Sequence, residues 1–228
     1  MNLYIFTQRD PVFIDQFLLN IDYTKFENVQ ILNSPNFGNS KFAAVKKFYK
    51  LFGFSATLNT IFKVLLNFKT LPEGVKLIDD SFPNLQNRIL TEDIQTEDIL
   101  LSVSAPHKID ENILRKFDIK INFHCGKLPK YAGMMPVFWQ MFNREKYYYI
   151  SMHELDNEID QGALLFEEEH PITKDLFETM VDCKLQSARI FNEFINGKLV
   201  CFRKDIKKTD SWNRYPTERQ IGNFWKSR

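Results

Sequence analysis

The sequence has almost no charge imbalance and no long apolar run, and each absence excludes a class of protein. Its 228 residues carry 30 basic and 29 acidic side chains, a formal net charge of +1. No broad electrostatic field is therefore available to hold a nucleic acid or an anionic membrane, so an anionic ligand has to be met by local groups. No apolar stretch approaches the roughly 18 residues that a membrane-spanning helix needs. We expect a soluble protein without a nucleic-acid or membrane partner.

Cysteine and histidine are also scarce. The three cysteines, Cys125, Cys183 and Cys201, are odd in number and far apart in the sequence. This usage favours reduced thiols over a disulfide framework, and with only four scattered histidines it predicts no metal site. The N-terminal segment MNLYIFTQRDP lacks the basic stretch and the long apolar stretch of a signal peptide. We therefore expect a cytoplasmic protein.

Strand-like and helix-like segments alternate through the first 124 residues. Short apolar runs rich in β-formers predict strands, and apolar residues at helical spacing predict helices between most of them. The predicted strands are 3–6, 29–32, 75–78, 98–105 and 118–124; the predicted helices are 11–20, 40–51, 56–68 and 110–117, with Gly53 dividing the middle pair. This alternation predicts an α/β fold with a Rossmann-like, mostly parallel sheet flanked by helices. Such a sheet binds its ligands beyond the carboxyl ends of the strands.

The pattern changes after residue 145. Two extended segments, 146–153 and 162–170, precede a helix over 174–196 with Thr173 as its cap and Asn196-Gly197 as its stop. A last strand near 198–203 and a short helix after Pro216 complete the chain. We predict a catalytic domain over 1–172 and a small C-terminal strand and helix appendage over 173–228 that packs on it.

The segment INFHCGKLPKYAGMMPVFW (121–139) places two polar side chains in an otherwise apolar strand. In extended backbone Asn122 and His124 share a face, with Cα atoms about 6.5 Å apart. A loop follows at once, where the sheet keeps its binding crevice. By spacing alone, a structural role is favoured, with Asn122 closing a turn and His124 hydrogen-bonded near a strand end.

A resemblance to a known family favours a functional role for Asn122 and His124 instead. The same segment, followed by SMHELDNEIDQGALL (151–165), resembles the signature of the folate-dependent formyltransferases. That signature has Asn-x-His, a Ser-Leu-Leu-Pro-x-Tyr-x-Gly loop, Pro-x-x-Trp, and later a His before an Asp-x-Gly turn. The resemblance covers roughly 98–170 and is closest to the nucleotide-sugar (amino-sugar) N-formyltransferases. Gly126, Lys127 and Ala132 depart from the family loop.

The resemblance implies a catalytic triad of Asn122, His124 and Asp160. Formyl transfer to an amine develops negative charge on the formyl oxygen, which a carboxamide can stabilise. His124 would polarise the carbonyl and take the amine proton, and Asp160 would orient the imidazole and pass the proton onward. Taken alone, Asp160 is better explained as a turn residue ahead of Gly162; the upstream pair Asn122 and His124 favours the triad. For His153 the family pattern allows a structural or a catalytic role.

The resemblance also implies N10-formyltetrahydrofolate as co-substrate, with no metal. It places the pteridine between residues 101–108 and the loop 154–160. The predicted folate contacts come from these two segments and from the loop after the Asn-x-His strand: Ser102, Val103, Ser104, Leu128, Pro129, Gly133, Leu155, Asp156 and Ile159. For the acceptor we predict base-stacking and phosphate contacts from Lys108, Tyr131, Trp212 and Tyr215, although ordinary packing is an equal alternative for the two tail aromatics. The basic run 203–208 and the acidic run 167–169 are typical of solvated surface.

Three acceptors have to be weighed. Initiator methionyl-tRNA enzymes carry a further nucleic-acid-binding domain, whereas about 60 residues follow the second motif here, and the net charge is nearly zero. Glycinamide ribonucleotide enzymes match the length, but the Pro-x-x-Trp segment and the tail SWNRYP resemble the amino-sugar branch more closely. We therefore expect a dTDP- or UDP-linked amino-dideoxy sugar, used for surface polysaccharide such as lipopolysaccharide O-antigen, and a homodimer. Glycinamide ribonucleotide transfer, a catalytically idle folate-binding relic and a formyl-folate hydrolase are the alternatives.

Overall fold

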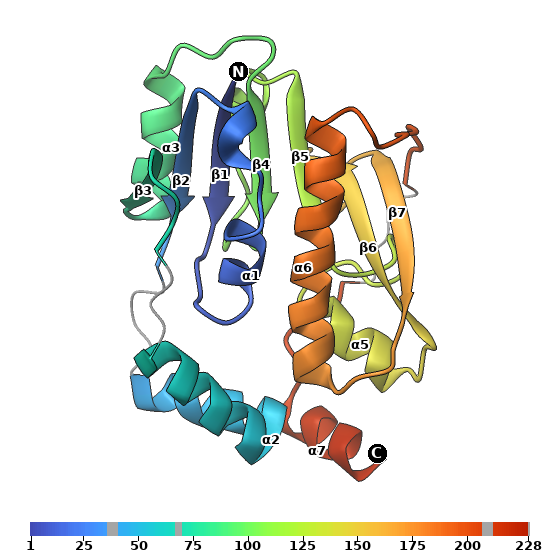
Figure 1. Ribbon diagram of the computed structural model, residues 1–228. Coiled ribbons are helices and arrows are strands. Elements are labelled where there is room, and N and C mark those ends of the chain that lie inside the picture. Colours follow the sequence, from blue (N-terminus) through green and yellow to red (C-terminus); the bar gives the residue numbers. More distant parts are fainter. Residues whose placement is uncertain (36–40, 67–69, 207–211, 228) are drawn as a thin grey trace.

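A mostly parallel sheet forms the centre of the protein. The computed structural model describes residues 1–35, 41–66, 70–206 and 212–227. Within them seven strands form one sheet in the order β3-β2-β1-β4-β5-β6-β7 (Figure 1). The first five strands run parallel, and β6 and β7 are antiparallel to their neighbours. The strands are β1 (Asn2–Thr7), β2 (Asn28–Asn33), β3 (Val75–Asp79), β4 (Ile99–Val103), β5 (Ile119–His124), β6 (Tyr147–Glu154) and β7 (Leu164–Pro171). The predicted α/β class is confirmed.

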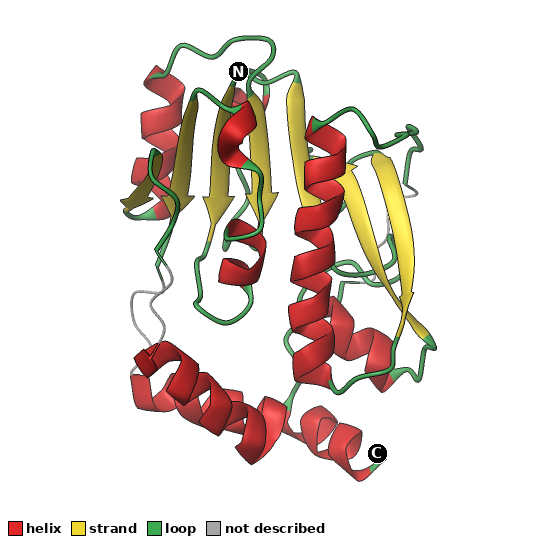
Figure 2. Ribbon diagram, viewed as in Figure 1, coloured by secondary structure: helices red, strands yellow, loops and turns green. Residues whose placement is uncertain are grey.

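Helices cover both faces of this sheet (Figure 2). They are α1 (Ile14–Leu18), η1 (Tyr23–Lys25), α2 (Lys41–Leu66), α3 (Phe82–Thr91), α4 (Glu111–Leu114), α5 (Pro136–Phe142), α6 (Leu176–Ile195) and α7 (Glu218–Lys226). The helices predicted over 11–20, 110–117 and after Pro216 thus form as the shorter α1, α4 and α7, whereas α3 and α5 were not predicted. None of the helices in the described segments is both long and apolar enough to cross a membrane.

Alternation along β1 creates two separate cores. Leu3 and Ile5 point to one face and join a core shared by α1, α5 and α6. Tyr4 and Phe6 point to the other face and join a core shared by α3 and α4. Because successive side chains of a strand point to opposite faces, a strand buried on both faces is apolar at every position. β1 therefore occupies the middle of the sheet.

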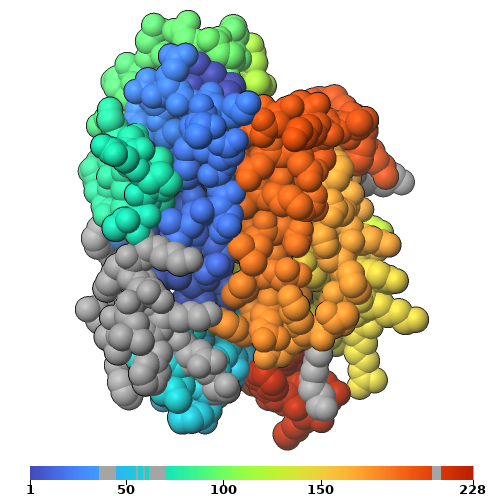
Figure 3. All heavy atoms as spheres, in the orientation of Figure 1, coloured from blue at the N-terminus to red at the C-terminus, as the bar shows by residue number. Residues whose placement is uncertain are grey.

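Helix α6 is an integral part of the first core. Buried side chains along its length, such as Leu176, Cys183 and Phe191, belong to that core. The space-filling view shows α6 directly against the N-terminal segment (Figure 3). Asp175 caps the helix by accepting from the Glu178 amide, so the predicted cap Thr173 is wrong by two residues, while Asn196 is the C-cap as predicted. The division of the chain at residue 172 stays a prediction.

Helix α2 lies beyond the carboxyl ends of the parallel strands, beside α7 (Figure 1). Gly53 interrupts it with φ 80° and ψ −178°, so the segment is two helices across a kink, as the sequence predicts. Phe48 and Phe52 pack with Phe13 of α1 and Phe177 of α6 at ring separations of 4.5 to 6.4 Å. This aromatic cluster holds α2 across the end of the sheet.

The strand predicted near 198–203 is wrong. Only an isolated antiparallel bridge joins Lys204 to Leu164, next to a hydrogen bond from the Phe202 amide to the Leu165 carbonyl. Val200 is 88% exposed and Phe202 45% exposed, and of this apolar segment only Leu199 packs against a core. A β-like pattern without burial gains too little from packing to form a regular strand.

Candidate active site

A cleft of about 670 Å³ opens at the carboxyl ends of the central strands. Two walls form it, and they belong to opposite faces of the sheet. One wall comes from the loops after β4 and β6, where Ala105, Ile109 and Leu155 pack on the α3/α4 core. The other wall comes from α1, α6 and the C-terminal tail, where Phe13 and Met180 pack on the α6 core. We call these the α4-side half and the α6-side half of the cleft; the end of β5 lies between them.

Asn122 contacts His153 across the pairing of β5 and β6. The register places the two residues directly opposite each other, and the Asn122 Nδ2 lies 2.9 Å from the His153 Nε2. The other ring nitrogen, Nδ1, lies 2.8 Å from the Glu154 carbonyl oxygen. A carbonyl only accepts, so Nδ1 carries a hydrogen, and Nε2 of the neutral ring accepts from the Asn122 amide. One N–H of the carboxamide is thereby used and the second remains for a ligand.

His124 is buried and has defined neighbours on both ring nitrogens. Its Nε2 lies 2.8 Å from the Tyr131 carbonyl oxygen, so this nitrogen donates. Its Nδ1 lies 3.4 Å from Oδ2 of Asp160, and both side chains are only 7% exposed. When Nδ1 takes up a proton, the positively charged ring of His124 therefore forms an ion pair with the Asp160 carboxylate.

Asp160 lies between the two imidazoles. Its Oδ2 accepts a hydrogen bond of 2.9 Å from the Gly133 amide, and its Oδ1 lies 3.6 Å from Nε2 of His153. Burial alone raises the pKa of Asp160, but the two histidines and the Gly133 amide outweigh it and lower the pKa to about 2. The carboxylate is thus ionised at neutral pH. The structure brings together Asn122, His124 and Asp160, as predicted, and adds His153 to them.

Unusual backbone conformations gather at this cleft. Among the described residues, four non-glycine residues have positive φ, and three of them, Ser104, Met135 and Asp160, line the cleft. Such conformations are costly for L-residues and occur most often at functional sites. Gly162 follows Asp160, and a Cβ there would lie 2.0 Å from the Glu154 carbonyl oxygen. Only glycine therefore fits beside the strand end that carries His153.

The C-terminal tail is fastened to the loop that holds Asp160. Asn213 pairs with Gly133 in a short parallel bridge: its amide donates to the Ala132 carbonyl and its carbonyl accepts from the Met134 amide. Trp139 Nε1 also donates to the Arg214 carbonyl at 3.0 Å. These contacts bring the flanking residues Trp212 and Tyr215 to the cleft.

Most of the predicted contact residues line the cleft. They are Ser102, Ser104, Lys108, Gly133, Leu155, Asp156, Ile159, Trp212 and Tyr215. Lys108 lies 3.8 Å from Glu158, and one face of the Tyr215 ring is covered by the Lys47 ammonium, 3.7 Å from the ring centre. That face of Tyr215 is not open for base stacking in this arrangement.

Four predicted contact residues lie elsewhere. Val103 belongs to the core, and Leu128 and Pro129 are not among the residues that line the cleft. Tyr131 points its hydroxyl away, to Glu145 at 2.7 Å, although its backbone carbonyl holds His124. A loop motif identifies the turn, but it does not say which side of the turn faces the ligand.

The sequence reading missed Lys184, which lines the α6-side half. It is only 8% exposed and lies one helical turn from Met180 and one from Ala188, on the buried face of α6. A lysine at an apolar position of an amphipathic helix was a signal that could have found it. Gln8 and Asp10, which follow β1, also line the cleft and were missed.

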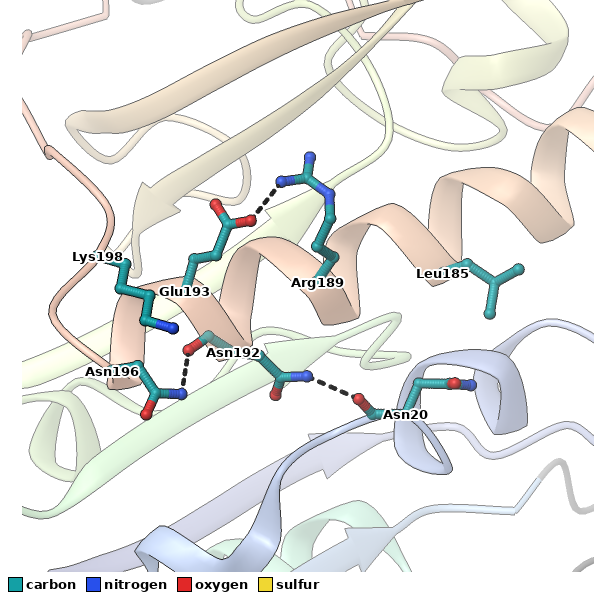
Figure 4. Close-up of a pocket in the computed structure, with 7 residues that line it drawn as sticks. All are labelled: Asn20, Leu185, Arg189, Asn192, Glu193, Asn196 and Lys198. Atoms are coloured by element: carbon teal, nitrogen blue, oxygen red, sulfur yellow. Dashed lines mark hydrogen bonds and ion pairs between the residues drawn. The ribbon is translucent and has the colours of Figure 1, made fainter.

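A second hollow of about 390 Å³ lies on the outer side of α6 (Figure 4). Its polar groups bind one another: Arg189 pairs with Glu193 at 2.8 Å, and the Asn192 amide donates to the Asn20 carbonyl at 2.8 Å. These contacts fasten α6 to the segment after α1. Among the described residues, no group of three or more His, Cys, Asp or Glu side chains is arranged to hold a metal ion. The predicted catalytic residues Asn122, His124 and Asp160 line the first cleft and not this hollow.

Comparison with known proteins finds formyltransferases. No family model matches the chain. It is 28% identical over 124 residues to the bifunctional polymyxin resistance protein ArnA of Wigglesworthia glossinidia brevipalpis, covering 52% of this chain and 18% of ArnA. It is 32% identical over 78 residues to the methionyl-tRNA formyltransferase of Enterococcus faecalis, covering 34% of this chain and 25% of that enzyme. The chain thus matches a quarter or less of the length of these curated relatives.

Solved structures extend the similarity to nearly the whole fold. A sugar N-formyltransferase from Shewanella has a TM-score of 0.57 at 16% identity and covers 98% of this chain and 86% of its own. The glycinamide ribonucleotide transformylase 1 of Symbiobacterium toebii has a TM-score of 0.55 at 11% identity, covering 91% and 94%. WlaRD, a sugar 3-N-formyltransferase crystallised with dTDP and 5-N-formyl-THF, has a TM-score of 0.50 at 23% identity, covering 92% and 66%. Sugar and glycinamide ribonucleotide enzymes both share this fold, and the resemblance that the motifs indicate is confirmed.

Proposed function

We propose that this chain, whose fold is that of the folate-dependent formyltransferases, transfers a formyl group from N10-formyltetrahydrofolate to the amine of a nucleotide-linked amino sugar. The observation that carries the proposal is the convergence of Asn122, His124 and Asp160, from two separate segments, at the carboxyl ends of the strands. A dTDP-linked acceptor, a role in surface polysaccharide such as O-antigen, a cytoplasmic location and a homodimer are parts of the same proposal.

The α4-side half fits the folate co-substrate. Ile109, Leu114 and Leu155 give it apolar walls suited to a flat heterocycle, and the two loops that carry them are linked by the ion pair of Lys108 with Glu158. When bound, N10-formyltetrahydrofolate supplies the formyl carbon and a folate nitrogen as leaving group. The residues of this half would orient that carbon toward the end of β5.

Asn122 would stabilise the charge that develops on the formyl oxygen. One N–H of its carboxamide is already directed at His153, and this bond fixes the plane of the amide. The second N–H can meet the oxygen without a reorganisation of the site, which is the arrangement that makes such donors effective. His153 acts in this scheme as a positioning residue.

His124 would take the proton of the attacking amine at Nδ1. Its Nε2 hydrogen is directed at the Tyr131 carbonyl, so the ring is held by the backbone and Nδ1 faces Asp160. Because Asp160 stays ionised, the protonated ring is stabilised as soon as it forms. The sequence-based prediction assigns carbonyl polarisation to both Asn122 and His124. In this arrangement Asn122 alone is placed to polarise the carbonyl.

The nucleotide-sugar acceptor is favoured by the sugar formyltransferases of the same fold, one of which was crystallised with dTDP. Tyr215 and Trp212 supply aromatic surface at the α6-side half, where such an acceptor would lie. Glycinamide ribonucleotide is the second candidate acceptor, because an enzyme for it has an equally similar fold.

The test is tetrahydrofolate release by the purified protein from N10-formyltetrahydrofolate with a panel of dTDP- and UDP-amino sugars and with glycinamide ribonucleotide. We expect turnover with at least one amino sugar, and a loss of about 10² to 10⁴-fold in kcat for His124→Asn, the range for a lost acid–base group. His170→Asn on β7, outside the cleft, is the matched control and should keep its rate. Turnover of glycinamide ribonucleotide alone would favour the second candidate, and no turnover with any acceptor would favour an idle folate-binding protein.

A further inference from the structure

Lys184 is a buried cation at the wall of the cleft. Its side chain is 8% exposed, and its Nζ donates to the Ser104 hydroxyl at 3.1 Å. The ammonium also lies close to the sulfur of Cys125, whose pKa is lowered first by a hydrogen bond from Cys183 and then by the charge of Lys184. An ammonium has three N–H donors, and the Ser104 hydroxyl uses one of them. Lys184 lines the cleft, so a further N–H can meet a ligand there.

The nearby carboxylate of Asp10 forms no ion pair with Lys184: the charge of Lys184 lowers the pKa of Asp10, but burial outweighs it and raises that pKa overall. Asp10 directs its carboxylate at the start of α1, where it accepts from the amides of Val12, Phe13 and Ile14 at 2.7 to 3.2 Å. Among the described residues no carboxylate forms an ion pair with Lys184. A buried charge is costly unless a counter-charge meets it, so the position is suited to an anionic ligand.

The location points to the acceptor and not to the folate. Lys184 lies on α6, and Met180, one turn before it, and Cys183, its neighbour, belong to the core on the α6 side of the sheet. The folate walls, in contrast, pack on the core of the opposite face. Asp10 already occupies the amides that open α1, so that helix end offers no competing anion site.

We propose that Lys184, oriented by Ser104, binds a phosphoryl oxygen of the acceptor and so selects acceptors that carry a phosphate group. This inference rests on the proposed function, and it adds the residue that recognises the phosphate. A single ammonium is a point charge that suits a phosphate oxygen, whereas a carboxylate is met best by the two-pronged guanidinium of arginine. Phosphate in a nucleoside diphosphate and phosphate in a mononucleotide present the same chemistry to it.

The experiment is a set of binding titrations by calorimetry with dTDP, UDP, glycinamide ribonucleotide and thymidine. Wild type should bind at least one phosphorylated probe more tightly than thymidine. Lys184→Met, which keeps the length of the side chain, should weaken that probe by about 10- to 100-fold, the range for a hydrogen bond to a charged group, and leave thymidine unchanged. The control Lys198→Met removes the same charge from the outer side of α6 and should bind like wild type. Ser104→Ala, at an exposed position, should weaken binding of the same phosphorylated probe by a smaller factor. This second variant tests the inference even if Lys184→Met does not fold.

The outcomes separate this inference from the proposed function. Binding of 5-formyl-tetrahydrofolate should be the same in wild type and Lys184→Met, because the apolar folate walls are formed by Ile109, Leu114 and Leu155; Lys184 reaches the α4-side half only at the Ser104 hydroxyl. If phosphorylated probes bind Lys184→Met and Ser104→Ala as tightly as wild type, or if wild type shows no preference for any of them over thymidine, the inference is overturned even where formyl transfer is observed. Absence of folate binding and of transfer would instead overturn the proposed function. Which phosphorylated probe loses affinity in Lys184→Met identifies a diphosphate or a mononucleotide acceptor.

Discussion

Asp160 couples the chemistry of the cleft to the stability of the protein. Its pKa of about 2 in the folded protein is below the ordinary value of 3.8, so the ionised carboxylate stabilises the fold above about pH 4. The contribution, about 2 kcal/mol, is lost as the pH falls from 4 toward 2. We predict that Asp160→Asn destabilises the protein by about this amount at pH 7 and by much less at pH 2.5, measured by urea unfolding. The exposed control Asp93→Asn should change the free energy of unfolding little at either pH. An equal effect of Asp160→Asn at both pH values would contradict the lowered pKa of Asp160.

Gly162 holds the backbone where no other residue fits. An alanine Cβ would meet the Glu154 carbonyl oxygen at 2.0 Å, so Gly162→Ala has to displace the strand end that carries His153. We predict a loss of about 2 to 4 kcal/mol in the free energy of unfolding, together with lower activity. Gly222→Ala is the matched control: it lies in α7 with open space around it and should stabilise the protein by up to about 1 kcal/mol. A Gly162→Ala variant as stable as wild type would show that the contact relaxes freely.

At the scale of single residues, the two-residue alternation of side chains in a strand predicts part of the site. Alternation in β5 is enough to place Asn122 and His124 on one face. The contact of Asn122 with His153 could not be predicted from the sequence. It depends on the register between β5 and β6, which a single sequence does not fix. Asp160 was found only through the family motif, since an aspartate before a glycine is otherwise typical of any turn.

At the scale of elements, the aromatic cluster decides where α2 lies. Phe52 is 8% exposed and contacts Phe13, Phe48 and Phe177, whereas Phe54, two residues later, is 69% exposed. We predict that Phe52→Ala costs about 3 to 5 kcal/mol in unfolding free energy and that Phe54→Ala stays within about 0.5 kcal/mol. Equal effects of both substitutions in urea unfolding would mean that α2 is not docked on α1 and α6.

Elements with a local signal were predicted and those without one were not. Gly53 marks the break in α2 because its φ of 80° is open to glycine and strained for other residues. The segment 198–203 has the composition of a strand, but its contact with the edge strand β7 is limited to Leu164 and Leu165 at the start of that strand, and most of its apolar side chains stay exposed. Helix α5 was not predicted, because Pro136 starts it directly after a turn and its seven residues are too few for a helical period to stand out in a run of apolar and aromatic side chains.

At the scale of the whole molecule, near-neutral charge is the property that bears on the acceptor. The fold alone does not choose between sugar and ribonucleotide enzymes, because both share it at similar TM-scores. Composition argues against one option that the curated relatives raise, since one of them is a methionyl-tRNA formyltransferase. Binding of tRNA relies on many contacts between basic side chains and phosphates, and these residues carry a net charge of only +1.

We predict that these 228 residues neither bind nor formylate methionyl-tRNA. In filter binding at about 150 mM salt, no binding tighter than the non-specific range of roughly 10⁻⁴ to 10⁻⁶ M should be observed. Part of the local basic charge is already paired, since Arg203 of the basic run forms an ion pair with Glu154. A methionyl-tRNA formyltransferase assayed alongside serves as the positive control. Specific binding at this salt concentration, or formylation of methionyl-tRNA, would contradict the prediction. It would show that a few local cations are sufficient for tRNA binding, and methionyl-tRNA would then replace the nucleotide sugar as the proposed acceptor.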